Sequence, residues 1–158
     1  MNTKILSEAV HKIPLIDPIA DYLAGTKTTA PLNMREAHAC TFNLYWGVGA
    51  TGTSTVTIEA CDDTTPTNVS ALAFRYRIRT ATDVWGALTA ATTTGFTTTA
   101  GSSQWYQIHV DADSLAASGY KYLRLKAVEV VASARLGGCW AELWPLRIQR
   151  AVTATQLT

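Results

Sequence analysis

The chain is poor in charged residues and in cysteine, and it has no long apolar run. Only 16% of its 158 residues are charged and the formal net charge is +1, a balance that does not favour wrapping nucleic acid. Three widely spaced cysteines without a CxxC pair, Cys40, Cys61 and Cys139, argue against a disulfide framework and favour a reduced compartment. No stretch approaches the ~20 apolar residues of a membrane helix. The first eighteen residues lack the apolar core of a signal peptide, so we expect folding in a cytoplasm.

The sequence motifs of common enzymes are also missing. There is no GxSxG elbow, no P-loop and no dinucleotide-binding glycine fingerprint. His11, His38 and His109 lie far apart, and no Cys or Glu is placed to complete a metal site with them. We therefore expect a protein that is not an enzyme and that uses no cofactor and no metal.

Asp111 and Asp113 have the spacing of the first calcium ligands in a metal-binding loop. Such a loop needs a glycine at its sixth position and a closing glutamate, but Ala116 stands at the sixth position and no Glu follows. The simpler interpretation is structural: Asp113 or Ser114 caps a single helical turn, which Gly119 then ends.

Alternation of apolar and polar residues indicates β-strands. Tyr106, Ile108 and Val110 share one face of a strand, and Leu123 and Leu125 alternate with polar neighbours in another. Strands are expected at residues 37–46, 54–61, 72–79, 105–111, 122–131 and 138–150, with weaker candidates at 85–88 and 95–99. This spacing predicts an all-β fold, a single β-sandwich with a jelly roll as the candidate topology. Residues 89–103, nearly all Thr, Ala, Gly and Ser, are expected to form an exposed hairpin or loop.

Residues 1–35 differ from the rest of the chain. Pro14 and Pro18 keep this segment extended, and its apolar side chains are Ile13, Leu15, Ile16, Ile19, Tyr22 and Leu23. We interpret residues 1–35 as an N-terminal arm that packs on a neighbouring molecule, residues 36–150 as the sandwich and residues 151–158 as a C-terminal tail. The alternative is that the segment is an edge strand of the domain's own sheet.

Arginine and tryptophan are the candidate contact residues of the sandwich. Arg75, Arg77 and Arg79 alternate with apolar residues and so form a cationic stripe on one strand. The stripe is either a solvated face that discourages edge aggregation or a docking surface for an acidic protein. Trp140 and Trp144, two of five tryptophans, face outward if the intervening apolar residues face the core. Outward tryptophans suit an interface or a sugar-stacking platform, whereas a thick core would bury them.

Four sequence phrases together resemble small head proteins of tailed bacteriophages. They are VTIEACDD at 56–63, ALAFRY at 71–76, and IHVDADSL at 108–115 followed by YLRL at 122–125. This family includes auxiliary capsid (decoration or cement) proteins, and the similarity spans roughly residues 54–130. The resemblance implies a β-sandwich on the capsid surface, assembled in the host cytoplasm, that bridges major capsid protein subunits. It also implies a homo-oligomer, a trimer in preference to a dimer. The outward Trp140 and Trp144, with Pro145 bending the last strand or placing it at an edge, independently suggest that this strand contributes to the contact between copies.

We accordingly expect capsid or subunit contacts at Ile13, Leu15, Ile16, Tyr22, Arg75, Arg77, Arg79, Trp140 and Trp144. The expected partners are the major capsid protein and further copies of this chain, without nucleic acid or membrane. Two alternatives stay open, namely a neck or tail component of the phage and a carbohydrate-binding β-sandwich module.

Overall fold

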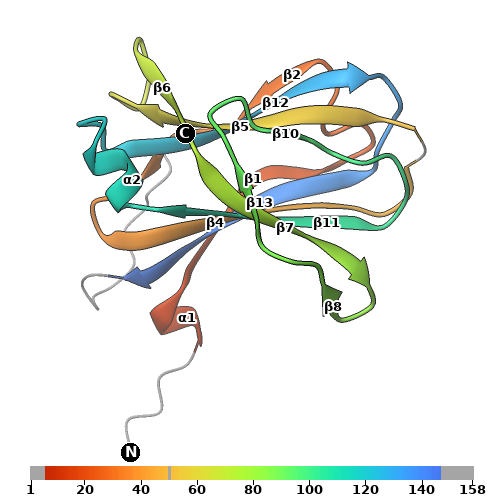
Figure 1. Ribbon diagram of the computed structural model, residues 1–158, viewed down its shortest axis with the longest axis horizontal. Helices are drawn as coiled ribbons and strands as arrows, with labels where there is room; N and C mark the ends of the chain where they lie inside the picture. Colours follow the sequence, from red (N-terminus) through yellow and green to blue (C-terminus); the bar gives the residue numbers. More distant parts are fainter. Residues whose placement is uncertain (1–5, 50, 147–158) are drawn as a thin grey trace, which may run out of the picture.

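The computed structural model describes residues 6–49 and 51–146, which fold into two antiparallel sheets packed face to face (Figure 1). The larger sheet has the order β1 (His11–Ile19), β13 (Gly137–Leu146), β4 (Ala37–Trp46), β11 (Gln104–Asp111), β7 (Phe74–Ala81) and β8 (Val84–Trp85), with β9 (Thr89–Ala91) also beside β7. The prediction of an all-β sandwich is therefore confirmed.

The smaller sheet has the order β10 (Phe96–Thr97), β5 (Thr53–Cys61), β12 (Tyr122–Val131) and β2 (Thr26–Thr28). The short strands β3 (Leu32–Asn33) and β6 (Val69–Leu72) pair with β12 and β5 respectively. Two single helical turns, α1 (Leu6–Ala9) and α2 (Asp113–Ala116), complete the described elements.

The core lies between the sheets and is built from every second side chain of the long strands. At one end of the core an aromatic cluster forms around Trp46, whose ring stacks on Tyr106 at 5.5 Å and lies 6.2 Å from Tyr22. The guanidinium of the buried Arg135 lies 5.4 Å from the Trp46 ring and donates a 2.6 Å hydrogen bond to Ser54 Oγ. No carboxylate of the described chain forms an ion pair with Arg135.

The segment interpreted as an N-terminal arm belongs to the sandwich itself. β1 pairs with β13 from His11 opposite Leu143 to Ile19 opposite Gly137. Tyr22 is fully buried, and β2 and β3 complete an edge of the smaller sheet. No domain boundary falls at residue 36, and the edge-strand alternative is the one the structure supports. The prolines fit this position because an edge strand leaves one side of its backbone without a sheet partner. The tail predicted at 151–158 lies outside the described residues.

Several local predictions need correction. The strand expected at 72–79 is two strands, because the chain leaves the smaller sheet after Leu72 and enters the larger one at Phe74. α2 has Ala112 as its N-cap residue, without a side-chain capping bond. The loop expected at 89–103 contains β9 and β10, with Ala91 and Thr98 buried. β13 pairs with both β1 and β4, but its pairing with β1 stops at Leu143, so Pro145 lies where β13 has a neighbouring strand on one side only, in agreement with the expected edge position.

Candidate functional site: the outer face of the larger sheet

The register of the larger sheet brings chemically distinctive side chains onto its solvent-facing side. Trp140 lies opposite Asn43, Asn43 opposite Gln107, and Gln107 opposite Arg77, so one row crosses four strands. We call this surface the outer face. Its residues are Lys12, Pro14, Thr41, Asn43, Tyr45, Arg75, Arg77, Arg79, Trp85, Trp105, Gln107, His109, Trp140, Glu142 and Trp144.

Four aromatic rings form a continuous row on the outer face. Trp105 is central, with ring centroids 5.0 Å from Trp85, 5.9 Å from Tyr45 and 5.9 Å from Trp140. The corresponding interplanar angles are 68°, 74° and 51°. We call Tyr45, Trp85, Trp105 and Trp140 the aromatic row. Its rings meet edge to face or tilted, so they do not form the flat platform that stacks on a sugar ring.

The arginine stripe, Arg75, Arg77 and Arg79, runs along β7 beside the aromatic row. The Arg77 guanidinium lies 4.7 Å from the centroid of Trp85, and that of Arg79 lies 5.8 Å from the centroid of Tyr45. Such cation–π contacts contribute about 0.5–1 kcal/mol at exposed sites. Arg79 Nη2 also donates to the Ser103 carbonyl at 2.8 Å. The rings and the carbonyl therefore hold the guanidinium groups in defined positions.

A hydrogen-bonded chain beneath the aromatic row fixes Arg77. Asn43, which is 1% exposed, accepts at Oδ1 from Trp105 Nε1 at 3.1 Å and from Gln107 Nε2 at 3.2 Å. Gln107 Oε1 in turn accepts from Arg77 Nε at 2.9 Å and from Nη2 at 2.6 Å. The Asn43 Nδ2 donor is buried without a hydrogen-bond partner among the described residues. Gln107 thus occupies the Nε–Nη2 edge of the Arg77 guanidinium and leaves Nη1 without a hydrogen-bond partner among the described residues.

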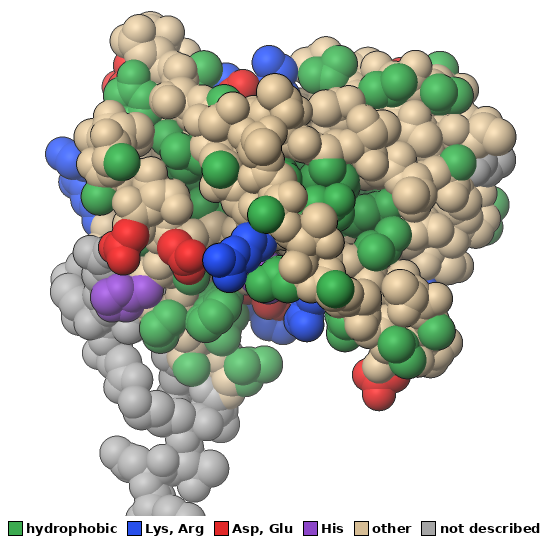
Figure 2. Space-filling model, in the orientation of Figure 1, with side chains coloured by type: hydrophobic (Ala, Val, Ile, Leu, Met, Phe, Trp, Pro, Cys, Tyr) green, Lys and Arg blue, Asp and Glu red, His purple; other side chains and the backbone are tan. Residues whose placement is uncertain are grey.

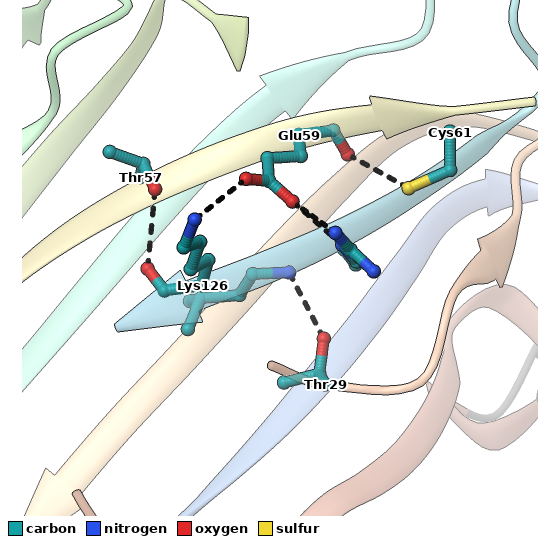
Figure 3. A network of polar contacts seen from close by, with 7 residues as sticks. Thr29, Thr57, Glu59, Cys61 and Lys126 are labelled. Carbon is teal, nitrogen blue, oxygen red and sulfur yellow. Dashed lines mark hydrogen bonds and ion pairs between the residues drawn. The ribbon is translucent and has the colours of Figure 1, made fainter. Parts of the chain in front are cut away.

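The two sheets differ in how their charged side chains are paired. On the smaller sheet the buried carboxylate of Glu59 pairs with Arg124 at 2.7 Å and with Lys126 at 3.5 Å (Figure 3). On the outer face only Lys12 and Glu142 form an ion pair, at 3.5 Å, and within the described chain the arginine stripe has no carboxylate partner. The side of the molecule drawn in Figure 2 carries few charged side chains among hydrophobic and uncharged ones.

His109 and Trp144 share a hydroxyl at the far end of the outer face. Trp144 Nε1 donates to Thr41 Oγ1 at 2.9 Å, and Thr41 Oγ1 lies 3.0 Å from His109 Nδ1. Burial lowers the pKa of His109, the nearby Arg77 charge lowers it further, and Asp111 opposes the shift. His109 is therefore held neutral at neutral pH, and its ring tautomer decides whether Nδ1 or the Thr41 hydroxyl is the donor of their hydrogen bond. The Trp144 side chain stays 41% exposed.

An apolar hollow of roughly 390 Å³ adjoins the aromatic row where β1 pairs with β13. Its walls include Pro14, Ile16, Pro18, Tyr45, Leu136 and Trp140, and Asp17 is the one charged residue of the lining. Tyr45 and Trp140 belong both to this apolar hollow and to the aromatic row, so the two features are continuous. A second hollow, of roughly 380 Å³, lies at the other end of β7 and β11, where Arg75, His109, Asp111 and Ser114 bring charges of both signs together.

The structure separates the predicted contact residues into two groups. Ile13, Leu15, Ile16 and Tyr22 lie in or against the core, so their interpretation as an arm surface is corrected. The prediction that Trp140 and Trp144 face outward is confirmed, because Ala141 and Leu143 between them are buried. The three arginines also lie on the outer face, as expected from their alternation.

Several residues of the outer face were missed by the sequence reasoning. They are Asn43, Tyr45, Trp85, Trp105 and Gln107. For Trp105 and Gln107 a signal was present, because both alternate with the residues expected in the core, Tyr106 and Ile108. Their contact with the arginines depends on the pairing of β11 with β7, which no local pattern specifies.

Other potential sites are sparse in the part of the chain that the structure describes. No group of three His, Cys, Asp or Glu side chains is placed to hold a metal ion within residues 6–49 and 51–146. Burial raises the pKa of the Cys61 thiol to about 11 and that of Cys139 to about 12. Among the described helices none has the length and apolar character needed to cross a membrane.

Comparisons with protein-family models, with curated proteins and with solved structures found no match.

Proposed function

We propose that this chain is a virion structural protein that binds a phage capsid and stabilises it by bridging major capsid protein subunits, as a decoration or cement protein without catalytic activity. The observation that carries the proposal is the outer face. Tryptophan, tyrosine and arginine are the residues most enriched among interface hot spots, and here they form one continuous surface on a rigid sheet.

Two further features support this role. The sequence phrases described above resemble those of phage head proteins. In addition, eight of the strands follow a recognisable order. One sheet contains β1-β13-β4-β11 and the other β2-β12-β5-β6. If these eight strands are renumbered 1 to 8 along the chain, the two orders become 1-8-3-6 and 2-7-4-5. We take this order as that of a jelly roll, an architecture used by viral capsid domains and by lectins. Because a fold does not determine a function, the outer face remains the principal argument.

The test is to add the purified protein to capsid shells that lack it and to determine the particle structure by cryo-electron microscopy. A decoration protein is expected at hundreds of copies over the shell surface. A ring of about six or twelve copies at one vertex would instead indicate the neck or tail component, and no density would reject binding to the virion. Binding in a glycan array without binding to shells would favour the carbohydrate-binding alternative, which the tilted rings of the aromatic row do not favour.

Self-association is part of the same proposal, with a trimer preferred. Trp144 and the exposed Val48 and Val130 provide apolar surface for contacts between copies. Sedimentation of the free protein at micromolar concentration tests this. A trimer is expected, whereas a clean monomer would restrict any oligomer to the assembled shell.

A further inference from the structure

We infer that the outer face recognises an acidic segment of its partner that carries one large apolar side chain, with the apolar hollow taking that side chain and the arginine stripe pairing with the carboxylates. The inference rests on the proposed function, because it specifies the chemistry of the shell surface to which this protein binds. It concerns a polypeptide partner and not a second copy of this chain.

The first step is charge complementarity. The three ion pairs of the described chain use Lys12, Arg124 and Lys126 as the cations, so all three members of the arginine stripe lack a carboxylate. Arg77 keeps Nη1, and Arg79 keeps Nε and Nη1, without a hydrogen bond to any described residue. A guanidinium presents its donors in a planar fork that matches a carboxylate. The free donors of the stripe therefore point to carboxylates supplied by a partner.

The second step is continuity between the arginine stripe and the apolar hollow. Tyr45 forms part of the hollow wall, and the Arg79 guanidinium lies 5.8 Å from its ring. Trp140 forms another part of the wall and lies 5.9 Å from Trp105, which leads to Trp85 and Arg77. A single extended segment can therefore place an apolar side chain in the hollow and carboxylates along the stripe. The hollow has the volume of an ordinary ligand pocket.

Charge opposes a contact between the arginine stripes of two copies. An isologous interface whose two-fold axis passes through the stripe would bring two unpaired arginine stripes face to face. Like charges brought together in this way cost several kcal/mol. The positions of Arg77 and Arg79 are already set by Gln107, Ser103 and the rings, so little conformational entropy is lost when a carboxylate binds.

The main experiment measures binding of the full-length protein to shells that lack it. Arg77→Gln/Arg79→Gln removes the unpaired cations, and Leu136→Glu places a carboxylate at the rim of the apolar hollow. Each change is expected to weaken binding at least tenfold, which corresponds to about 1.4 kcal/mol. The first removes hydrogen bonds to charged groups, and the second places an unpaired carboxylate against an apolar side chain of the partner. Arg35→Gln and Val69→Glu are matched controls, because both residues are exposed and lie away from the outer face. They should bind like the unmodified protein.

A second arm tests the chemistry without shells. Four fluorescent dodecapeptides are compared. Three of them have a central Trp and otherwise consist of glutamates, glutamines or lysines. The fourth consists of glutamates with a central Ala. Fluorescence anisotropy should rank the glutamate–Trp peptide first and show no binding of the lysine peptide. Arg77→Lys/Arg79→Lys keeps the charge but loses the planar fork, so it should bind the glutamate–Trp peptide more weakly than the unmodified protein does. Thermal unfolding of each variant establishes that it is folded.

The outcomes separate the inference from the proposed function. If the unmodified protein decorates shells and the Arg→Gln and Leu136→Glu variants decorate them equally well, the inference is wrong and the proposed function stands. If the unmodified protein does not bind shells but selects the glutamate–Trp peptide through the arginines, the proposed function fails and the recognition chemistry stands. Equal binding of all four peptides would overturn the recognition chemistry.

Discussion

Removal of residues 1–35 should abolish folding of the remaining chain. The segment supplies β1 and places five buried apolar side chains in the core, those of Ile13, Tyr22, Leu23, Leu32 and Met34. Burial of a large apolar side chain contributes ~1.5–3 kcal/mol, so the deletion removes roughly 7–15 kcal/mol. The whole free energy of unfolding of a typical domain is only about 5–15 kcal/mol. The loss is thus as large as the stability available.

The assay is thermal and urea unfolding followed by far-ultraviolet circular dichroism and tryptophan fluorescence. The chain from Glu36 onward should show no cooperative transition. A chain starting at Val10 is the matched control, because it loses α1 but keeps β1 and the five core side chains, and it should unfold close to the full-length midpoint. Leu23→Ala in the full chain gives an intermediate case and should lower the free energy of unfolding by about 2–5 kcal/mol.

One result would refute this reasoning. If the chain from Glu36 unfolds cooperatively with a midpoint within a few degrees of the full-length value, the first 35 residues do not belong to the core. The pairing of β1 with β13 would then be dispensable, and the interpretation of the segment as a detachable arm would be correct after all.

Three further predictions follow from individual buried groups. The folded-state pKa of His109 lies below its ordinary value of 6.5. Because the unfolded chain therefore binds more protons below that pH, the free energy of unfolding should fall as pH decreases through 6.5. His109→Gln should reduce this pH dependence, and the remaining dependence is expected from His11, whose pKa is also lowered. Arg135→Ala should lower the free energy of unfolding by about 2–4 kcal/mol in urea titrations, because it empties a packed site beside Trp46, and no change would contradict the buried position. Burial raises the pKa of all three thiols, those of Cys40, Cys61 and Cys139. A thiol reagent at pH 7.5 should therefore label none of these cysteines in the native protein and all of them in urea.

The sequence predicted best those features that depend on neighbours along the chain. β4 and β12 have the limits expected from alternation, and the inward residues Phe42, Leu44, Leu123 and Leu125 are buried. Period-two alternation works here because each face of a strand meets a single environment, the core or the solvent. The same logic placed Trp140 and the arginines on the outer face.

Features that depend on distant pairing could not be predicted in this way. β1 pairs with β13, more than a hundred residues away in the chain, so the apolar side chains near the N-terminus looked like an unpaired arm. Residues 72–79 were predicted as one strand because the alternation continues across Ala73, where the chain changes from one sheet to the other. Trp85 and Arg77 meet through a hairpin and a cation–π contact, and neither has a local sequence signature.

The contrast between the two sheets explains why the outer face is the candidate docking surface. On the smaller sheet Glu59 has two cationic partners from β12, so the charges of this cluster are already paired and offer little to a ligand. On the larger sheet the strand pairing places Gln107, a neutral acceptor, beside Arg77 where a carboxylate would neutralise it. Gln107 fixes the direction of the guanidinium without cancelling its charge. An oriented but unneutralised cation next to partly exposed aromatic rings retains its attraction for an external carboxylate, and this combination is the basis of the proposed recognition of an acidic partner.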